Sequence, residues 1–181
     1  MAALAALGGV FSSTVSMLRA AVHALVGFPF GMQFLAGVHV LWLVVAVGLI
    51  RKPGAATFTG LLKGTVELLS GNPLGLFVLL LSGLAGIVVD GIWLLCGRRA
   101  SSLVYMLAGG LGTASNVFVG VLAASLPASG NVYTGVGVML GMAFLSGVVL
   151  AGLLGWRLLE TLRLAGVVGA LSESSATHRA A

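Results

Sequence analysis

Residues 73–96 read PLGLFVLLLSGLAGIVVDGIWLLC, an apolar run in which Asp90 is the single charged residue. About 20 such residues in a helix cross the roughly 30 Å of hydrocarbon in a bilayer. Inside a bilayer every backbone N–H and C=O must be paired within the protein, which leaves helices or closed barrels. Because the run is continuous and does not alternate between apolar and polar residues, it predicts a transmembrane helix.

The whole chain has the composition of a membrane protein. Of its 181 residues, 59% are hydrophobic and 7% are charged, and the mean hydropathy is +1.17. A soluble domain is about one quarter charged, so these few ionic groups cannot make a water-facing surface. The composition therefore predicts an all-α membrane protein.

The net charge of +5 and the pI near 10.4 also have a membrane explanation. In a soluble protein they would suggest nucleic acid, but here the basic residues stand at helix ends, where they meet anionic headgroups. Cys96 is the single cysteine, which excludes an internal disulfide and a metal site of several cysteines. The first basic residue, Arg19, follows the first apolar stretch, so we expect no cleaved signal. We expect one membrane domain over residues 1–171 and a polar, disordered tail over 172–181.

Breaks at Pro, Gly, Asn and charged residues divide the chain into six predicted spans. They are Ala2–Val26, Gly31–Ile50, Gly54–Leu69, Pro73–Cys96, Ser101–Leu126 and Asn131–Gly155. The third span is short and contains Lys63 and Glu67. It could therefore be tilted, shielded by its neighbours or only partly inserted.

The basic residues near the predicted spans are confined to alternate connections. They are Arg51 and Lys52 between spans two and three, Arg98 and Arg99 between spans four and five, and Arg157, Arg163 and Arg179 after span six. Basic residues stay on the cytoplasmic side of a membrane. We therefore expect a protein of the cell (cytoplasmic) membrane with both termini in the cytoplasm. Residues 156–171 have the periodicity of an amphipathic helix, which could extend span six, lie on the membrane or dock a partner.

Small residues recur four positions apart, a spacing that lets membrane helices approach closely. Such pairs are Ala2/Ala6, Ala5/Gly9, Ala20/Ala24 and Gly137/Gly141. Packing inside the bundle explains most of them. The pairs in the first span could instead contact another membrane subunit.

Hydrogen-bonding side chains within the spans gather in the predicted outer half of the membrane. They are Arg19, Gln33, His39, Glu67, Asn72, Asn116, Asn131 and Tyr133. Buried ionisable groups in membranes are costly and are usually functional or paired. A few convergent polar groups between apolar walls are typical of a small-molecule site, so the pattern predicts a pocket that opens outward.

Each of these polar residues also has a structural explanation. Lys63 and Glu67 are four residues apart and could simply neutralise each other. His39 and Asn116 could be interhelical hydrogen-bonding residues. Asp90, in the inner half of span four, is expected to pair with Arg98, Arg99 or a basic partner subunit. Trp42 and Trp93 are expected to serve in packing or as interfacial anchors.

No enzyme motif is present. The three histidines, His23, His39 and His178, lack metal-ligand spacing with carboxylates, and there is no P-loop, nucleophile elbow or catalytic carboxylate pair. We therefore expect a protein that is not an enzyme, uses no cofactor or metal, and cannot use ATP by itself.

One stretch resembles a known family. Residues 51–56 read Arg-Lys-Pro-Gly-Ala-Ala, a predicted helix with Glu67 follows, and residues 71–75 read Gly-Asn-Pro-Leu-Gly. This arrangement resembles the YkoE-like substrate-binding S components of energy-coupling-factor (ECF) vitamin transporters. The resemblance is clearest from Gly31 to Asp90, and the rest of the chain matches mainly in hydropathy.

The resemblance implies a six-helix bundle that captures a vitamin at its outer face. It implies partners as well, namely a transmembrane T subunit and two cytoplasmic ATPase subunits. Family members are linked to thiamine or its hydroxymethylpyrimidine precursor, for which the Glu67 carboxylate is a natural partner. Small residues of the first helix would contact the T subunit, and aromatic residues would stack on the ligand. The resemblance would give the subunit contact to Ala2, Ala6 and Gly9, and the candidates for stacking on the ligand are Phe28, Phe30, Phe34 and Tyr133.

Two other functions are compatible with the sequence. A self-contained channel or small transporter would need a polar track across the whole membrane, and the inner half offers only Asp90. A structural subunit of a larger membrane complex would use the polar groups as interhelical contacts.

Overall fold

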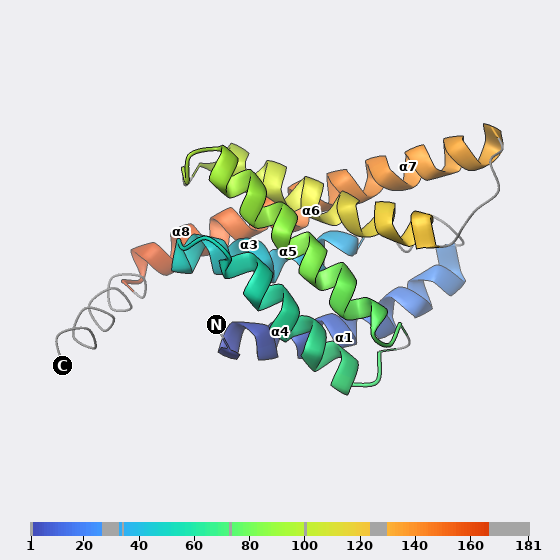
Figure 1. Ribbon diagram of the computed structural model, residues 1–181, viewed down its shortest axis with the longest axis horizontal. Coiled ribbons are helices and arrows are strands. Elements are labelled where there is room, and N and C mark those ends of the chain that lie inside the picture. Colours follow the sequence, from blue (N-terminus) through green and yellow to red (C-terminus); the bar gives the residue numbers. More distant parts are fainter. Residues whose placement is uncertain are drawn as a thin grey trace.

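The computed structural model describes residues 2–26, 33, 35–72, 74–99, 101–123 and 130–166, with side chains at all of these except 17–26, 130 and 131. The described residues form helices and no strands, as predicted (Figure 1). The helices are α1 (Ala2–Val26), α3 (Ala36–Ile50), α4 (Ala55–Leu69), α5 (Phe77–Leu95), α6 (Ser102–Ala123) and a last run made of α7 (Gly130–Ser146), η1 (Gly147–Leu153) and α8 (Leu154–Leu164). The described residues therefore form a bundle of six helical runs.

Two of the predicted helix starts are corrected. Span four was expected from Pro73, but α5 begins at Phe77, because Leu74 to Leu76 form a turn. In that turn the Asn72 side-chain oxygen accepts a hydrogen bond from the Leu74 N–H at 3.0 Å. Span two was expected from Gly31, whereas α3 begins at Ala36.

The last helical run differs from the prediction more clearly. Gly155 was expected to end span six, but the run continues through η1, a π-helix, into α8. Gly155 is buried against Val44 of α3, and Leu159, one turn later, is also buried. Gly166, with φ of 74°, follows the end of the run. The amphipathic segment thus extends span six as far as Leu164, and the predicted tail over 172–181 lies outside the described residues.

Helix α3 lies at the centre of the bundle. It is apolar on every side, and ten of its residues, from Ala36 to Gly48, are buried. A helix that is hydrophobic all round is one covered by protein on all faces. It contacts α1, α4, α5, α6, α7, η1 and α8, so every other helix is positioned relative to it.

Glycines allow two pairs of helices to pack backbone to backbone. If Gly86 of α5 were replaced by a residue with a Cβ, that atom would lie only 2.6 Å from the Thr57 Cα of α4. A Cβ at Gly109 of α6 would likewise lie 2.6 Å from the Gly147 backbone oxygen of η1. By contrast, Gly137 and Gly141, which the four-residue spacing singled out, have no atoms within 4 Å of such a Cβ. Within the described residues, this pair therefore makes no close helix–helix contact.

The helices differ in their capacity to cross a membrane. By length and apolar composition, the runs Phe77–Leu95, Ser102–Ala123 and Val132–Leu164 are long enough to span one, and Ala2–Ser16 and Ala36–Ile50 are shorter apolar helices. Helix α4 has 15 residues and is about 22 Å long. It is shorter than the hydrocarbon thickness of about 30 Å, in agreement with the prediction that the third span is short, and α3 has the same number of residues.

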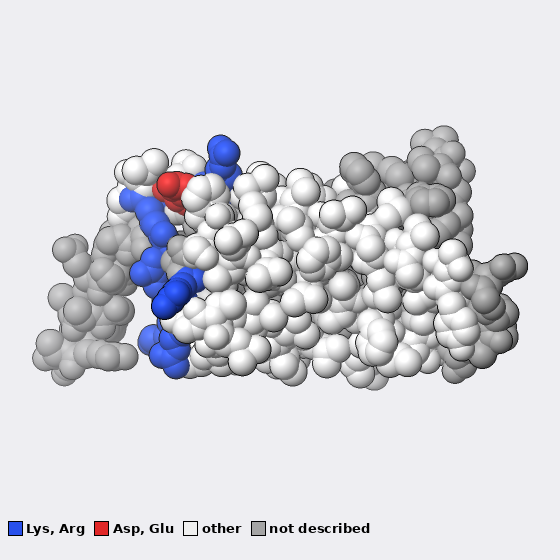
Figure 2. All heavy atoms as spheres, turned by 90° about the horizontal axis from the view of Figure 1, so that it is seen from above, with Lys and Arg blue, Asp and Glu red and all other residues white. Residues whose placement is uncertain are grey.

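The basic side chains visible on the surface gather at one end of the long molecule (Figure 2). This end is formed by Arg51 and Lys52 after α3, Arg98 and Arg99 after α5, and Arg157 and Arg163 of α8, and we call it the basic end. Figure 1 shows that the turn between α4 and α5 lies at the opposite end. The described surface between the two ends is uncharged in the view of Figure 2, as a lipid-facing surface requires.

Candidate functional site

Helix α4 turns a polar stripe toward the inside of the bundle. Its buried residues recur at helical spacing, from Ala55 and Ala56 through Thr59 and Gly60 to Lys63, Gly64 and Glu67. Gly60 and Gly64 let this face pack closely on Ser82 and Leu79 of α5. Lys63 and Glu67 are consequently 1% and 2% exposed, which is rare for charged residues unless they are paired.

Lys63 and Glu67 form an ion pair with each other. The Lys63 Nζ donates to the Glu67 Oε1, as in one of the two explanations that the sequence left open for this pair. His39 of α3 joins them, with its Nδ1 3.8 Å from the same oxygen of Glu67. We call His39, Lys63 and Glu67 the polar cluster. Its members come from two helices, and it lies in the half of α4 away from the basic end.

Helix α1 packs across this part of α3 and α4. A Cβ on Gly9 would touch Val66 and would lie 3.3 Å from the Lys63 backbone oxygen. Trp42, one turn from His39 on α3, packs over Gly8, and its ring meets that of Phe11 edge to face at 5.9 Å. Trp42 therefore packs between α3 and α1, in line with the packing role that was one of the two expected for it. Trp93 is likewise buried in the core.

Several buried polar atoms have no hydrogen-bond partner among the described residues. They are Ser12 Oγ, Gln33 Oε1, Trp42 Nε1, Thr59 Oγ1 and Asn116 Oδ1, among others. Buried polar groups in folded proteins are nearly always paired with protein or water. The hydrogen-bonding capacity of these atoms is therefore not filled by the described residues. Ser12, Trp42 and Thr59 were not among the residues predicted for the site, because their burial depends on the packing of α1, α3 and α4.

The structure separates the remaining predicted site residues. Gln33 is buried ahead of α3, and Asn116 is half-buried on α6. Asn72 uses its side-chain oxygen within the turn after α4, and Tyr133 of α7 is 65% exposed. Phe28, Phe30, Phe34 and the side chains of Arg19 and Asn131 lie outside the described residues.

Asp90 has a different role from the predicted one. It was expected to pair with Arg98, Arg99 or a partner subunit. Instead its carboxylate accepts hydrogen bonds from the Ala56 N–H at 3.2 Å, the Thr57 N–H at 2.8 Å and the Thr57 hydroxyl at 2.6 Å. A carboxylate at the first turn of a helix satisfies free N–H groups and meets the positive end of the helix dipole. Asp90 therefore caps α4.

The face of α1 that was predicted to contact a partner subunit is divided. Ala2 and Ala6 are exposed, whereas Gly9 is buried against Val66 of α4. The structure thus gives Gly9 an internal contact. Contact of Ala2 and Ala6 with a partner stays a prediction.

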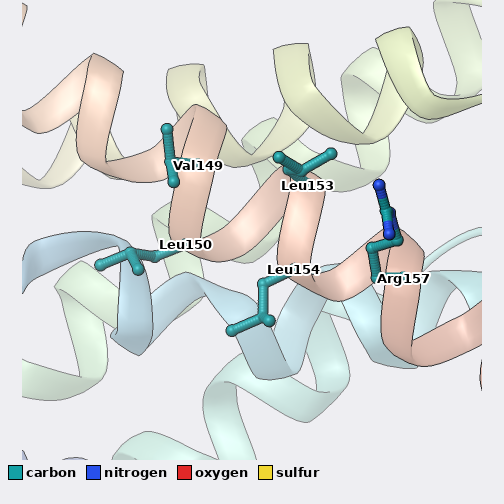
Figure 3. A pocket seen from close by; sticks show the side chains of 5 residues that line it. All are labelled: Val149, Leu150, Leu153, Leu154 and Arg157. Atoms are coloured by element: carbon teal, nitrogen blue, oxygen red, sulfur yellow. The ribbon is translucent and has the colours of Figure 1, made fainter.

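A second feature is a hollow of about 210 Å³ on the last helical run. Figure 3 shows its lining side chains on successive turns of η1 and α8, namely Val149, Leu150, Leu153, Leu154 and Arg157. The hollow includes no member of the polar cluster. Among the described residues no three His, Cys, Asp or Glu side chains come together to hold a metal ion.

Comparison with known proteins supports a transport role. Residues 1–116 match the model of a family described as the permease component of ABC-type cobalt transport systems. The chain is 30% identical over 147 residues to YkoE of Bacillus subtilis (strain 168), which carries the name HMP/thiamine permease protein, and the match covers 80% of this chain and 72% of YkoE. It also resembles the crystal structure of an S component of an ECF transporter, with a TM-score of 0.81, 27% identity and coverage of 99% of this chain and 91% of that one.

The matched family and fold are those of transporter components and not of enzymes. The S-component match extends over nearly the whole chain, and it confirms the six-helix membrane fold. The chain therefore belongs to the YkoE-like S components of ECF transporters.

Proposed function

We propose that this chain is the substrate-binding subunit of an ATP-driven ECF importer and captures thiamine or its hydroxymethylpyrimidine precursor. The observation that carries the proposal is the buried polar cluster of His39, Lys63 and Glu67 in an otherwise apolar bundle. Ionisable groups at such positions in membrane proteins usually serve ligands, ions or protons.

The orientation of the protein follows from its basic end. Because basic residues stay in the cytoplasm, the basic end faces inward, and both termini are cytoplasmic. The polar cluster then lies in the outer half of the cell (cytoplasmic) membrane. A ligand reaches it from outside, and Gln33 and Asn116 are expected in the same outer half from their positions in the sequence.

The chemistry of the cluster suits an aminopyrimidine ring. The Glu67 carboxylate accepts from an exocyclic amino group, while Lys63 or His39 donates to a ring nitrogen. The apolar walls exclude water, which strengthens these bonds. The unpartnered polar atoms of Ser12, Trp42 and Thr59 offer further hydrogen bonds to the ligand or to water.

Energy for import comes from other subunits in this proposal. The exposed small residues Ala2 and Ala6 of α1 form the contact with a transmembrane T subunit, which in turn binds two ATPase subunits. Gly9 supports that helix from inside by its close packing on α4.

The proposal is tested by identifying what the protein binds. The chain is purified from cells, and co-purified small molecules are identified by mass spectrometry. Thiamine or hydroxymethylpyrimidine is the expected result, with submillimolar binding of one of them in calorimetry. Absence of both from the preparation, together with no heat of binding, would overturn the proposed ligand class. Co-purification of ATPase subunits distinguishes an importer from a self-contained channel.

A further inference from the structure

We infer that the captured ligand has no net positive charge, and that Lys63 is the residue that sets this preference. The inference rests on the proposed function and narrows it to a substrate class. Within the proposed ligands, it selects an uncharged aminopyrimidine over a compound with a permanent thiazolium cation.

The first argument is the distribution of acidic residues. The chain has four, namely Glu67, Asp90, Glu160 and Glu173. Asp90 is occupied at the first turn of α4, next to the basic end, and Glu160 lies on α8 at that end. Glu173 follows α8 in sequence. Among the residues that the structure describes, Glu67 is therefore the one acidic residue in the half of the bundle where the polar cluster lies.

The second argument is that Lys63 already neutralises this carboxylate. Lys63 and Glu67 are both buried and bonded to each other. Their combined charge is zero whichever of the two holds the proton, and His39 adds either nothing or one positive charge. The cluster therefore has no net negative charge as long as the Lys63–Glu67 pair keeps this proton.

A permanent cation would leave this site with an unbalanced charge. Burying an unpaired charge away from water is strongly unfavourable. To bind a thiazolium ring, the pair would have to release a proton, so thiamine binding should strengthen as pH rises. An uncharged aminopyrimidine needs no such change, because it presents both hydrogen-bond donors and acceptors to the pair.

The test separates charge from shape. Thiamine and deazathiamine have nearly the same shape, but a neutral thiophene replaces the thiazolium ring in deazathiamine. Calorimetry on the purified wild-type protein should show at least tenfold tighter binding of deazathiamine than of thiamine. Hydroxymethylpyrimidine is measured alongside as the smaller uncharged ligand.

Lys63→Met is the decisive variant, because it keeps the length of the side chain and leaves Glu67 without a cation. It should shift the ratio of the two affinities toward thiamine by at least tenfold. Lys63→Gln, which keeps a polar end, provides the same test if the Met variant does not fold. Lys52→Met is the control, because Lys52 is exposed at the basic end, and it should leave the ratio unchanged.

Each outcome bears on a different claim. Tighter binding of thiamine than of deazathiamine by the wild type, or an unchanged ratio in both Lys63 variants, would overturn this inference and leave the proposed function standing. The wild type could bind only hydroxymethylpyrimidine. In that case, thiamine binding by either Lys63 variant would support the inference, and no thiamine binding by both variants would overturn it. No binding of any of the three ligands would overturn the proposed function itself.

Discussion

Asp90 of α5 caps α4 through Thr57, whose N–H and hydroxyl both donate to the Asp90 Oδ2, at 2.8 and 2.6 Å. The N-cap position of α4 is Gly54, which has φ of 83° and no side chain to accept such bonds. The carboxylate of Asp90, 33 residues after Thr57 in the sequence, takes that role. The cap holds one end of α4, and the other end of the same helix presents Glu67.

Replacing this carboxylate should destabilise the protein. Asp90→Ala leaves the buried N–H of Ala56 without its acceptor, and an unsatisfied buried donor costs about 1–3 kcal/mol. We expect a lower midpoint of thermal unfolding in detergent. Glu160→Ala, at an exposed position of α8, should change stability by less than about 0.5 kcal/mol.

The same pair predicts energetic coupling. Thr57→Val removes only the hydroxyl donor, and we expect it to lower the free energy of unfolding by about 1 kcal/mol. In a double-mutant cycle with Asp90→Ala, the two effects should not add. Additive effects would show that Asp90 stabilises the protein by another route.

The close contact of α4 and α5 gives a second prediction. Gly86→Ala places a methyl group against backbone atoms of Ala56 and Thr57, and such overpacking costs about 1–3 kcal/mol. Gly91→Ala on the same helix meets no atom within 4 Å and should be neutral or slightly stabilising. Equal stabilities of the two variants, measured by thermal unfolding, would contradict the observed helix packing.

Hydropathy and charge predicted the helices well, because both depend on the bilayer and not on tertiary contacts. The pairing of Lys63 with Glu67 was also predictable, since it is local to one helix. The cap by Asp90 was not, because it depends on the register of α4 against α5. The same reason explains why Gly86 makes the close contact and the regularly spaced Gly137 and Gly141 do not.

Helix ends were harder to predict than helices. Gly155 suggested the end of span six, yet a glycine facing a neighbouring helix is a packing residue, and here it meets Val44 of α3. The burial of Ser12 and Thr59 near the polar cluster likewise follows from helix packing. Single-sequence periodicity does not contain that information.

The orientation can be tested with the single cysteine. On a Cys96→Ser background, Ser70→Cys and Ser101→Cys place thiols at two exposed positions, one after α4 and one at the basic end. A membrane-impermeant maleimide added to intact cells should label position 70 and not position 101. Labelling of position 101 alone would reverse the proposed topology.

The proposed contact of α1 with a T subunit predicts a variant that fails in assembly but not in binding. Ala6→Leu enlarges an exposed position of α1 and should reduce co-purification with the T subunit while ligand affinity is unchanged. Ala123→Leu, at an exposed alanine of α6, is the matched control and should leave assembly intact. Equal assembly of both variants would place the subunit contact elsewhere.

The central claim is that the ligand binds at Glu67, and the most direct measurement is the dissociation constant of the Glu67→Gln variant for the ligand that the wild type binds. Loss of a hydrogen bond to a charged group costs about 1.5–3 kcal/mol, so the affinity should fall roughly 10- to 150-fold. Glu160→Gln, which removes an exposed acid outside the cluster, should retain the wild-type value. An unchanged affinity in Glu67→Gln would contradict the account and leave Glu67 with a structural role only.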